Sequence, residues 1–339
     1  MVEDVERVEG GRLGEFDLIA RYFAPLATEA AALGLRDDAA VLRPPEGQEI
    51  VLSCDTIVEG VHFLKDDPPG SIGHKALAVN LSDLAAKGAR PYVYLLALSL
   101  PAGTAATWLE AFASGLGELE KLSGIGLVGG DTTATPGPLS VTVTALGLVP
   151  QGHAVLRLGA KQGDRLYVSG AIGDAYLGLR VLKHPALGRF WGFSDDDTAF
   201  VVDRYRRPKP RNDLALLVRN FAQAAIDVSD GLMGDIEKLA RVSHGGALIE
   251  ASRVPFSPAA QKALEREPAL LEALVTAGDD YEIVAAVPEA SARYFEAEAL
   301  GKKLSVTMIG RVDGSSGEAR LLGPDGNTVK LDAKGFSHF

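Results

Sequence analysis

Two adjacent acids, Asp37 and Asp38, interrupt an apolar run at a turn that leads toward a strand. Acidic side chains recur in comparable settings, each at the end of an apolar segment: Asp55, Asp83, Asp131, Asp227, Asp230, Asp279 and Asp280. Chain turns of this kind present side chains to ligands, and carboxylate oxygens suit Mg²⁺, which usually sits between a few carboxylates and substrate phosphates. One such acid is more often a cap of a turn or helix. Their recurrence favours a Mg²⁺-dependent enzyme that acts on phosphorylated compounds by phosphoryl transfer.

Two glycine-bearing turns, residues 129–133 and 170–174, could bring backbone amides close to a phosphate. Tight-turn geometry is the alternative explanation for both. Residues 124–129 match the glycine spacing of a dinucleotide site, but two prolines follow where that site would open a helix. No Gly-x-x-x-x-Gly-Lys-Ser/Thr run occurs, so a P-loop is excluded. The six histidines lack paired metal spacing, which disfavours zinc, and His62 could equally be structural or a ligand.

Composition limits the partners. The 339 residues include 45 acidic and 34 basic side chains, for a net charge of −11. Binding a polyanion needs a basic footprint, so no nucleic acid is expected. The single cysteine, Cys54, leaves no internal disulfide, which predicts a reducing, cytoplasmic location. The acidic N-terminus has no signal-peptide pattern and no apolar run would span a bilayer, so no membrane is expected.

The elements that must position these acids alternate between strands and helices. The pattern predicts strands at 49–54, 92–100, 125–128, 139–149, 165–169, 225–228, 247–251, 281–287 and 305–309. It predicts helices at 16–27, 72–88, 105–122, 174–182, 232–242 and 289–300. This alternation indicates an α/β or α+β layered architecture. The polar, glycine-bearing stretch 150–164 places a boundary between a domain at 1–149 and a domain at 150–339.

Two charged segments are assigned to the periphery of this framework. The acids at 195–197 are interpreted as a solvated loop, and the basic stretch 204–211 as a helix boundary because its prolines prevent a regular helix. Phosphate contact by the basic stretch is the alternative. Residues 78–83 and 225–230 also echo each other. If that echo is more than chance, the two domains are distant relatives whose acids converge on one cleft.

Several segments, in order along nearly the whole chain, closely resemble the thiamine-monophosphate kinase family. They are Gly-Glu-Phe-Asp-Leu-Ile at 14–19, Asp-Asp at 37–38, Ser-Cys-Asp-Thr at 53–56, Glu-Gly-Val-His-Phe at 59–63, the run from His74 to Ala85, Gly-Gly-Asp-Thr-Thr at 129–133, Ala-Ile-Asp-Val-Ser-Asp-Gly-Leu at 225–232, Gly-Asp-Asp-Tyr-Glu at 278–282 and Lys-Gly-Phe-Ser-His-Phe at 334–339. Because these motifs recur in order, the resemblance is specific.

The resemblance implies ATP-dependent phosphorylation of thiamine monophosphate to thiamine diphosphate, the last step of thiamine diphosphate biosynthesis. Transfer would be direct and Mg²⁺-assisted, without a phosphoenzyme. It further implies the two-domain fold of the aminoimidazole ribonucleotide synthetase superfamily. The N-terminal domain would bind ATP and Mg²⁺ and join its sheet to that of a second copy in a homodimer, and the C-terminal α/β domain would complete the active site. The alternatives are another ATP-using member of that superfamily and a catalytically silent relative that senses nucleotide or thiamine phosphate.

The resemblance also assigns residues. The implied metal ligands are Asp38, Ser53, Cys54, Asp55, Asp83, Asp131, Asp227 and Asp230. The implied ATP contacts are Gly130, Asp131, Arg157 and Ser229, and the implied substrate contacts are His62, Asp279 and Phe336. No residue acts covalently; metal-bound Asp55, Asp83, Asp131 and Asp230 would stabilise charge, while an acid and an aromatic suit a cationic thiazolium and a pyrimidine ring. The chain departs from the family pattern at Arg36, at Cys54, where threonine is usual and only the carbonyl stays a hard ligand, and at Asp279, which replaces a frequent glutamate.

Overall fold

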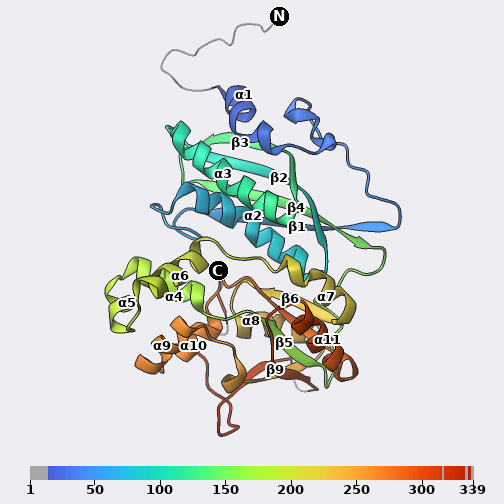
Figure 1. Cartoon of the computed structure of the whole chain (residues 1–339), viewed down its shortest axis with the longest axis vertical. Helices are drawn as coiled ribbons and strands as arrows, with labels where there is room; N and C mark the ends of the chain where they lie inside the picture. Colours follow the sequence, from blue (N-terminus) through green and yellow to red (C-terminus); the bar gives the residue numbers. More distant parts are fainter. Residues whose placement is uncertain (1–13, 315–316, 333–334, 337–339) are drawn as a thin grey trace, which may run out of the picture.

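The computed structural model describes residues 14–314, 317–332 and 335–336. Within them the chain forms two halves, each built around one sheet, that lie one above the other in Figure 1. The first sheet ends at Pro150 and the second begins at Arg165. The predicted domain boundary at 149/150 therefore lies at the last residues of the first sheet. None of the described helices is long and apolar enough to cross a membrane.

The first sheet has the strand order β1-β4-β2-β3, formed by β1 (Gln48–Val58), β2 (Arg90–Pro101), β3 (Gly126–Thr135) and β4 (Ser140–Pro150). Neighbouring strands are antiparallel except β2 and β3, which are parallel. Helices α2 (Pro69–Ala86) and α3 (Ala106–Ser123) cover one face. The strand predicted at 139–149 is confirmed as β4, and its side chains alternate: Val141 and Val143 are buried beneath these helices, whereas Thr142 and Thr144 face the other side.

That other side, here called the open face, carries apolar side chains. Ile50, Leu52 and Leu95 are 39%, 64% and 40% exposed there. Among the described residues, the segment from Ala27 to Leu42, which includes the 3₁₀ helix Ala30–Leu35, covers the part of the open face around Val93. These residues leave a large part of the apolar sheet surface accessible.

Helix α2 is buried almost all round, including His74, Lys75, Asn80 and Ser82. The burial follows from its place between the two halves, since α2 packs on β1 and β4 on one side and on β6, β8 and α7 on the other. A helix apolar on every face belongs in such a position. Its polar side chains must therefore find partners at the junction between the halves.

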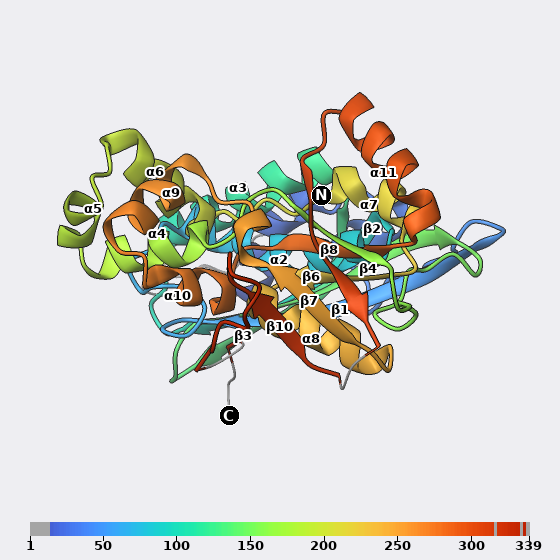
Figure 2. The same cartoon turned by 90° about the horizontal axis from the view of Figure 1, so that it is seen from below.

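The second sheet has the order β10-β7-β9-β5-β8-β6. Its strands are β5 (Arg165–Ser169), β6 (Ala224–Val228), β7 (Gly246–Glu250), β8 (Glu282–Val287), β9 (Val306–Asp313) and β10 (Ala319–Leu322). Its helices are α4 (Asp174–Lys183), α5 (Ala186–Phe190), α6 (Asp195–Arg206), α7 (Ala215–Phe221), α8 (Leu232–Val242), α9 (Pro258–Arg266), α10 (Leu270–Thr276) and α11 (Glu289–Gly301). Figure 2 shows α4, α5, α6, α9 and α10 gathered on one side of this half, and α7 and α11 on the other. The predicted layered α/β architecture is confirmed.

Two local predictions were wrong and a third holds in part. The segment expected to be helical at 16–27 is helical but irregular: α1 (Glu15–Leu18) is followed by a π-helical turn and by a 3₁₀ turn that contains Pro25, which cannot continue a regular helix. The strand expected at 125–128 and the turn expected at 129–133 form one strand, β3, which continues to Thr135 because its second half pairs with β2. The acids at 195–197 form the first turn of α6, where Ser194 and Asp197 make a reciprocal capping box.

Other elements were missed or reassigned. The pattern did not predict α5, α7, α9, α10 or β10, each of which has nine residues or fewer. The sequence similarity between 78–83 and 225–230 does not correspond to a shared structure, because the first segment is helical and the second begins as a strand. Both segments nevertheless end at the same cavity.

Candidate active site

A cavity of about 760 Å³ lies between the two halves, within the range of small-molecule sites. Both halves contribute to its wall. Nine of the residues predicted for the site line it: Asp55, His62, Asp83, Arg157, Asp227, Ser229, Asp230, Asp279 and Phe336. Of the closing segment 334–339, only Gly335 and Phe336 lie within the described residues. The fold therefore collects in one place acids that are far apart in the sequence.

Four aspartates, here called the acidic cluster, occupy one side of the cavity: Asp55, Asp83, Asp227 and Asp230. Asp55 points from β1 toward α2, and its N–H donates to the Asn80 side-chain oxygen at 3.1 Å. Ser53, two residues earlier on the same face, donates its hydroxyl to Asp83 at 2.5 Å. The alternation of a strand thus presents Ser53 and Asp55 together. Sequence reasoning placed Asp55 at the end of its strand, whereas β1 continues to Val58.

The acidic cluster crosses the junction between the halves. Asp227, at 5% exposure, accepts the hydroxyl of Ser82 at 2.9 Å. Burial, with Asp83 and then Asp230 nearby, raises the pKa of Asp55 to about 6. Burial, with Asp83 and then Asp235 nearby, raises the pKa of Asp227 well above its usual range. Ionised carboxylates therefore repel one another here, and bound cations would relieve the repulsion.

The donor chemistry of the acidic cluster suits Mg²⁺, since the donors are all oxygens. Across the described residues, however, no three carboxylate, imidazole or thiol side chains converge closely enough to hold an ion by themselves. Mg²⁺ is commonly bound by one or two carboxylates and completed by water and substrate phosphates. The residues present fit that kind of site, in which pairs from the acidic cluster would hold the ions.

Two residues that sequence reasoning missed organise the loop carrying Ser229 and Asp230. Asp235, in the first turn of α8 and 1% exposed, accepts the backbone N–H groups of both residues at 3.0 Å. Lys238 contacts Asp230 at 2.5 Å and Asp235 at 2.8 Å. An acid in the first turn of a predicted helix was the available signal for Asp235. No local signal identified Lys238.

The segment 278–281 also lines the cavity and has an uncommon backbone. Asp279 and Tyr281 have φ values of 75° and 51°, in the left-handed region. Their N–H groups donate to the carbonyls of Ser229 and Val228 at 2.9 and 2.8 Å. A Cβ on Gly278 would lie 2.2 Å from the Ser229 carbonyl oxygen, so only glycine fits. Asp279 is thus joined directly to the loop that carries Asp230 of the acidic cluster.

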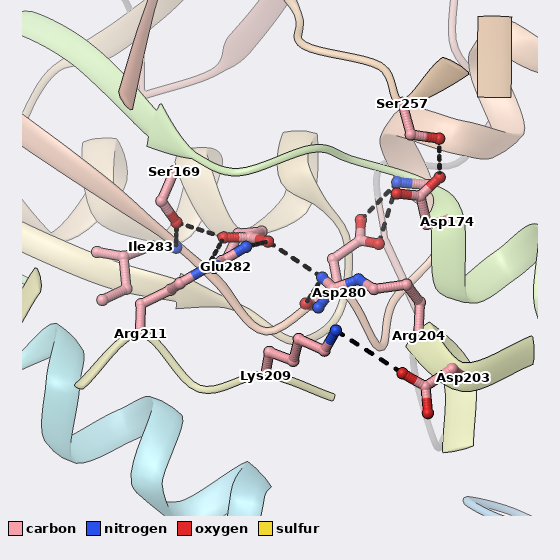
Figure 3. Close-up of polar contacts among 11 residues, drawn as sticks. Ser169, Asp174, Asp203, Arg204, Lys209, Arg211, Ser257, Asp280, Glu282 and Ile283 are labelled. Carbon is pink, nitrogen blue, oxygen red and sulfur yellow. Dashed lines mark hydrogen bonds and ion pairs between the residues drawn. The ribbon is translucent and has the colours of Figure 1, made fainter. Parts of the chain in front are cut away.

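A buried polar network holds this segment from the side away from the cavity (Figure 3). Asp280 accepts the N–H of Gly173 at 2.8 and 3.0 Å, and its carbonyl accepts from Arg204 at 3.0 Å. Glu282 pairs with Arg204 at 3.0 Å and with Arg211 at 2.5 Å. The Gly173 amide at the 170–174 turn therefore serves a carboxylate of the protein itself.

The four arginines of the basic stretch 204–211 pair with acids of the protein. Besides Arg204 and Arg211, Arg206 pairs with Asp67 at 2.6 Å and Arg207 pairs with Glu118. The pairs of Arg206 and Arg207 join α6 and the following loop to the first half. Phosphate contact by this stretch stays a prediction.

Five predicted site residues do not line the cavity: Asp38, Ser53, Cys54, Gly130 and Asp131. Ser53 is connected to it through the hydrogen bond to Asp83. Asp38 is exposed, and its N–H donates to the carboxylate of Asp37. The thiol of Cys54 lies on the open face and accepts the Thr144 hydroxyl at 3.3 Å. A role of Cys54 through its carbonyl and the roles of the other four residues remain predictions.

Gly130 and Asp131 lie on β3, at the edge of the sheet opposite β1. Three strand spacings separate β3 from β1, about 14 Å. In register, Asp131 aligns with Ala97, Thr142 and Thr56, so its side chain shares the open face with Thr56. A Cβ on Gly130 would lie 1.8 Å from the Leu96 carbonyl oxygen, which explains glycine at that position.

Comparison with known proteins identifies the class to which this fold and site belong. Residues 36–149 match the family described as AIR synthase related protein, N-terminal domain, and residues 161–322 match AIR synthase related protein, C-terminal domain. Solved structures of HypE, a hydrogenase maturation protein, at 21–24% identity share the fold. The chain is therefore a two-domain AIR synthase related protein.

Closer relatives narrow the assignment. The chain is 44% identical over 322 residues to the thiamine-monophosphate kinase of Caulobacter vibrioides, covering 94% of this chain and 89% of that one. Identity to the Escherichia coli K12 enzyme is 42% over 328 residues, with 96% and 98% covered. The crystal structure of the Stenotrophomonas maltophilia enzyme has a TM-score of 0.82 at 39% identity, with 94% and 98% covered. The structure of AaThiL complexed with AMPPCP and TMP has a TM-score of 0.75 at 29% identity, with 99% and 100% covered. The chain belongs to the thiamine-monophosphate kinase family.

Proposed function

We propose that the protein catalyses the ATP-dependent phosphorylation of thiamine monophosphate to thiamine diphosphate. The observation that carries the proposal is the convergence of the acidic cluster, contributed by both halves, with Asp279 and Phe336 in one cavity. Such an arrangement suits a reaction in which two phosphates must meet with their charge neutralised. The related structure that contains both AMPPCP and TMP supports the same pair of ligands.

Mg²⁺ held by the acidic cluster would supply the neutralising charge for direct transfer between phosphates. The protein itself positions the reactants. Arg157 and Ser229 line the cavity beside the acidic cluster and are assigned to the nucleotide. Asp131 and Gly130 remain proposed nucleotide contacts, and Asp38, Ser53 and the Cys54 carbonyl remain proposed metal contacts.

The substrate side is assigned to His62, Asp279 and Phe336. The Nδ1 atom of His62 accepts the Val58 N–H at 3.1 Å, which fixes the ring and leaves the proton of the neutral form on Nε2. The N–H of Phe336 donates to the Asp230 carbonyl at 2.8 Å. The aromatic ring of Phe336, 53% exposed, is thereby held at the edge of the cavity next to the acidic cluster.

We further propose a cytoplasmic homodimer in which the open faces of two first sheets pack together. The exposed apolar side chains on that face, Ile50, Leu52 and Leu95, support the pairing. Thr56 both lies on the open face and lines the cavity, so a second copy would reach the cavity rim. Light scattering should give twice the chain mass for the parent and a monomer for Leu52→Glu. A monomeric parent at micromolar concentration would contradict the dimer.

The activity is tested with purified protein, ATP, Mg²⁺ and thiamine monophosphate, with thiamine diphosphate quantified by chromatography. Formation of thiamine diphosphate that requires all three additions supports the proposal. Binding of both ligands without product would instead identify a silent relative. Hydrolysis of ATP only with aminoimidazole ribonucleotide precursors would identify a different member of the superfamily.

A further inference from the structure

Lys75 is a buried cation at the junction between the halves. It belongs to α2 and is 1% exposed. Its ammonium group donates to the His62 carbonyl at 2.8 Å and to Asp279 Oδ2 at 3.0 Å. It also lies 4.1 Å from the centroid of the Tyr205 ring, within cation–π distance. A buried ammonium is costly unless partners surround it, and here every partner belongs to the cavity wall or its support.

These contacts fix two substrate-side residues relative to each other. His62 lies in the first half, whereas Asp279 and Tyr205 belong to the second. The Tyr205 hydroxyl also reaches the His62 carbonyl, at 3.5 Å. The left-handed backbone of Asp279 leaves its side-chain torsions free, so the direction of its carboxylate depends on an anchor. Lys75 provides that anchor from the first half, and the network in Figure 3 fixes the neighbouring Asp280 and Glu282.

The same contacts change what Asp279 can offer a ligand. Its Oδ2 is paired with the ammonium of Lys75, and its Oδ1 accepts the Tyr281 hydroxyl at 3.2 Å. The side chain keeps 25% exposure toward the cavity. An ion pair carries no net charge, so it attracts a further cation weakly, while carboxylate oxygens retain lone pairs that accept hydrogen bonds.

We propose that Lys75 is a positioning residue that orients and neutralises Asp279, so that Asp279 binds the substrate as a hydrogen-bond acceptor for an amino group and not as a counter-ion for a cationic ring. The inference rests on the proposed function and deepens it. Thiamine monophosphate carries both groups, an aminopyrimidine and a thiazolium. The site therefore recognises the aminopyrimidine through Asp279, and recognition depends on the closed junction between the halves.

Steady-state kinetics of Lys75→Met, Asp279→Asn and the double variant test the proposal. Methionine keeps the length of the buried stem without its charge, and asparagine keeps one acceptor oxygen. We expect Lys75→Met to raise the KM for thiamine monophosphate about tenfold while the KM for ATP changes less than about twofold. The double variant should regain most of the loss, because its amide needs no counter-charge. Lys262→Met, on the surface in a 2.6 Å pair with Asp197, is the matched control and should change neither KM.

The alternative, that Asp279 is a counter-ion for the cationic ring, predicts the opposite change in KM. If Asp279 were a counter-ion, removing Lys75 would expose its charge and lower the KM for thiamine monophosphate, and that result would overturn the proposal. Oxythiamine monophosphate, which has a carbonyl in place of the amino group, should bind the parent at least about tenfold more weakly by calorimetry. Equal binding of the two compounds would also overturn it.

A ligand-free measurement separates this inference from the proposed function. Thermal unfolding of the four proteins in the double-mutant cycle reports the Lys75–Asp279 coupling without substrate. We expect Lys75→Met to lower Tm and the added Asp279→Asn to restore part of it. Additive changes would overturn the positioning role. A parent that makes no thiamine diphosphate but shows the coupling would refute the kinase activity and leave the positioning role supported.

Discussion

Asp55→Asn separates two effects of the acidic cluster: the loss of folding stability that its repulsion causes, and its contribution to catalysis. Asparagine has nearly the shape of aspartate, keeps the backbone N–H that donates to Asn80, and presents an N–H₂ group toward Asp83. The substitution removes one negative charge from a crowded, half-buried group of carboxylates. We expect it to stabilise the cation-free protein and to abolish thiamine diphosphate formation.

The size of the stabilisation follows from the pKa of Asp55. Burial and the neighbouring Asp83 raise that pKa from its usual 3.8 to about 6. An acid whose pKa is higher in the folded state destabilises that state increasingly as pH rises through this interval. Above pH 6 the cost is about 3 kcal/mol, and below pH 4 it disappears. Asp55→Asn should therefore raise Tm by about 4 °C at pH 7.5 and leave it nearly unchanged near pH 4.

Calorimetric melting from pH 4 to pH 8 in EDTA measures this difference, and activity is assayed in parallel. Mg²⁺ with ATP should stabilise the parent more than the variant, since bound cations relieve the same repulsion. Glu265→Gln, an exposed carboxylate on α9, is the control and should change Tm by little at any pH. A variant less stable than the parent at pH 7.5, or a gap independent of pH, would refute the repulsion. Retained kinase activity would show that Asp55 holds no metal.

Further variants probe other contacts of the site and one buried carboxylate outside it, Glu120 on α3, which accepts the Tyr94 hydroxyl at 2.9 Å. Ser53→Ala removes a hydrogen bond to the acidic cluster and should raise the Mg²⁺ concentration for half-maximal activity about tenfold. Cys54→Ala removes a thiol that lies on the open face and should change that concentration less than about twofold. Titration of the activity with Mg²⁺ compares the two variants. Burial raises the pKa of Glu120 to about 7, so ionisation of Glu120 destabilises the folded state increasingly as the pH rises above 4.5. Glu120→Gln should therefore raise Tm at pH 8 but not at pH 4. An equal rise in Tm at both pH values would contradict this cause. Gly278→Ala, whose Cβ would meet the Ser229 carbonyl, should cost about 1–3 kcal/mol in urea unfolding and lower kcat/KM at least tenfold; normal kinetics would show that the loop tolerates the displacement.

The broken N-terminal helix shows how far local patterns extend. The apolar spacing of residues 16–27 was correctly read as helical, but a single proline and the packing on α3 divide it into three short turns. The acids at 195–197 were misread for the opposite reason. Their charge suggested a solvated loop, whereas a Ser194 cap and acids in the first turn stabilise the start of a helix.

The sequence by itself determined most strands and helices, the layered architecture, the family and the identity of the acids. These depend on local periodicity, on turn residues and on the order of motifs, all of which can be recognised in the sequence without knowledge of long-range contacts. Nine of the predicted site residues could be named and later found in one cavity for that reason.

Only the tertiary structure decided which acids meet and what accompanies them. Strand order separates Asp131 from Asp55 by the width of the sheet, and strand alternation turns Cys54 away from its neighbours. Lys75 and Asp279, 204 residues apart, become partners because α2 is buried between both sheets. Pairing and burial at such separations depend on the packing of the whole chain, which no local pattern specifies.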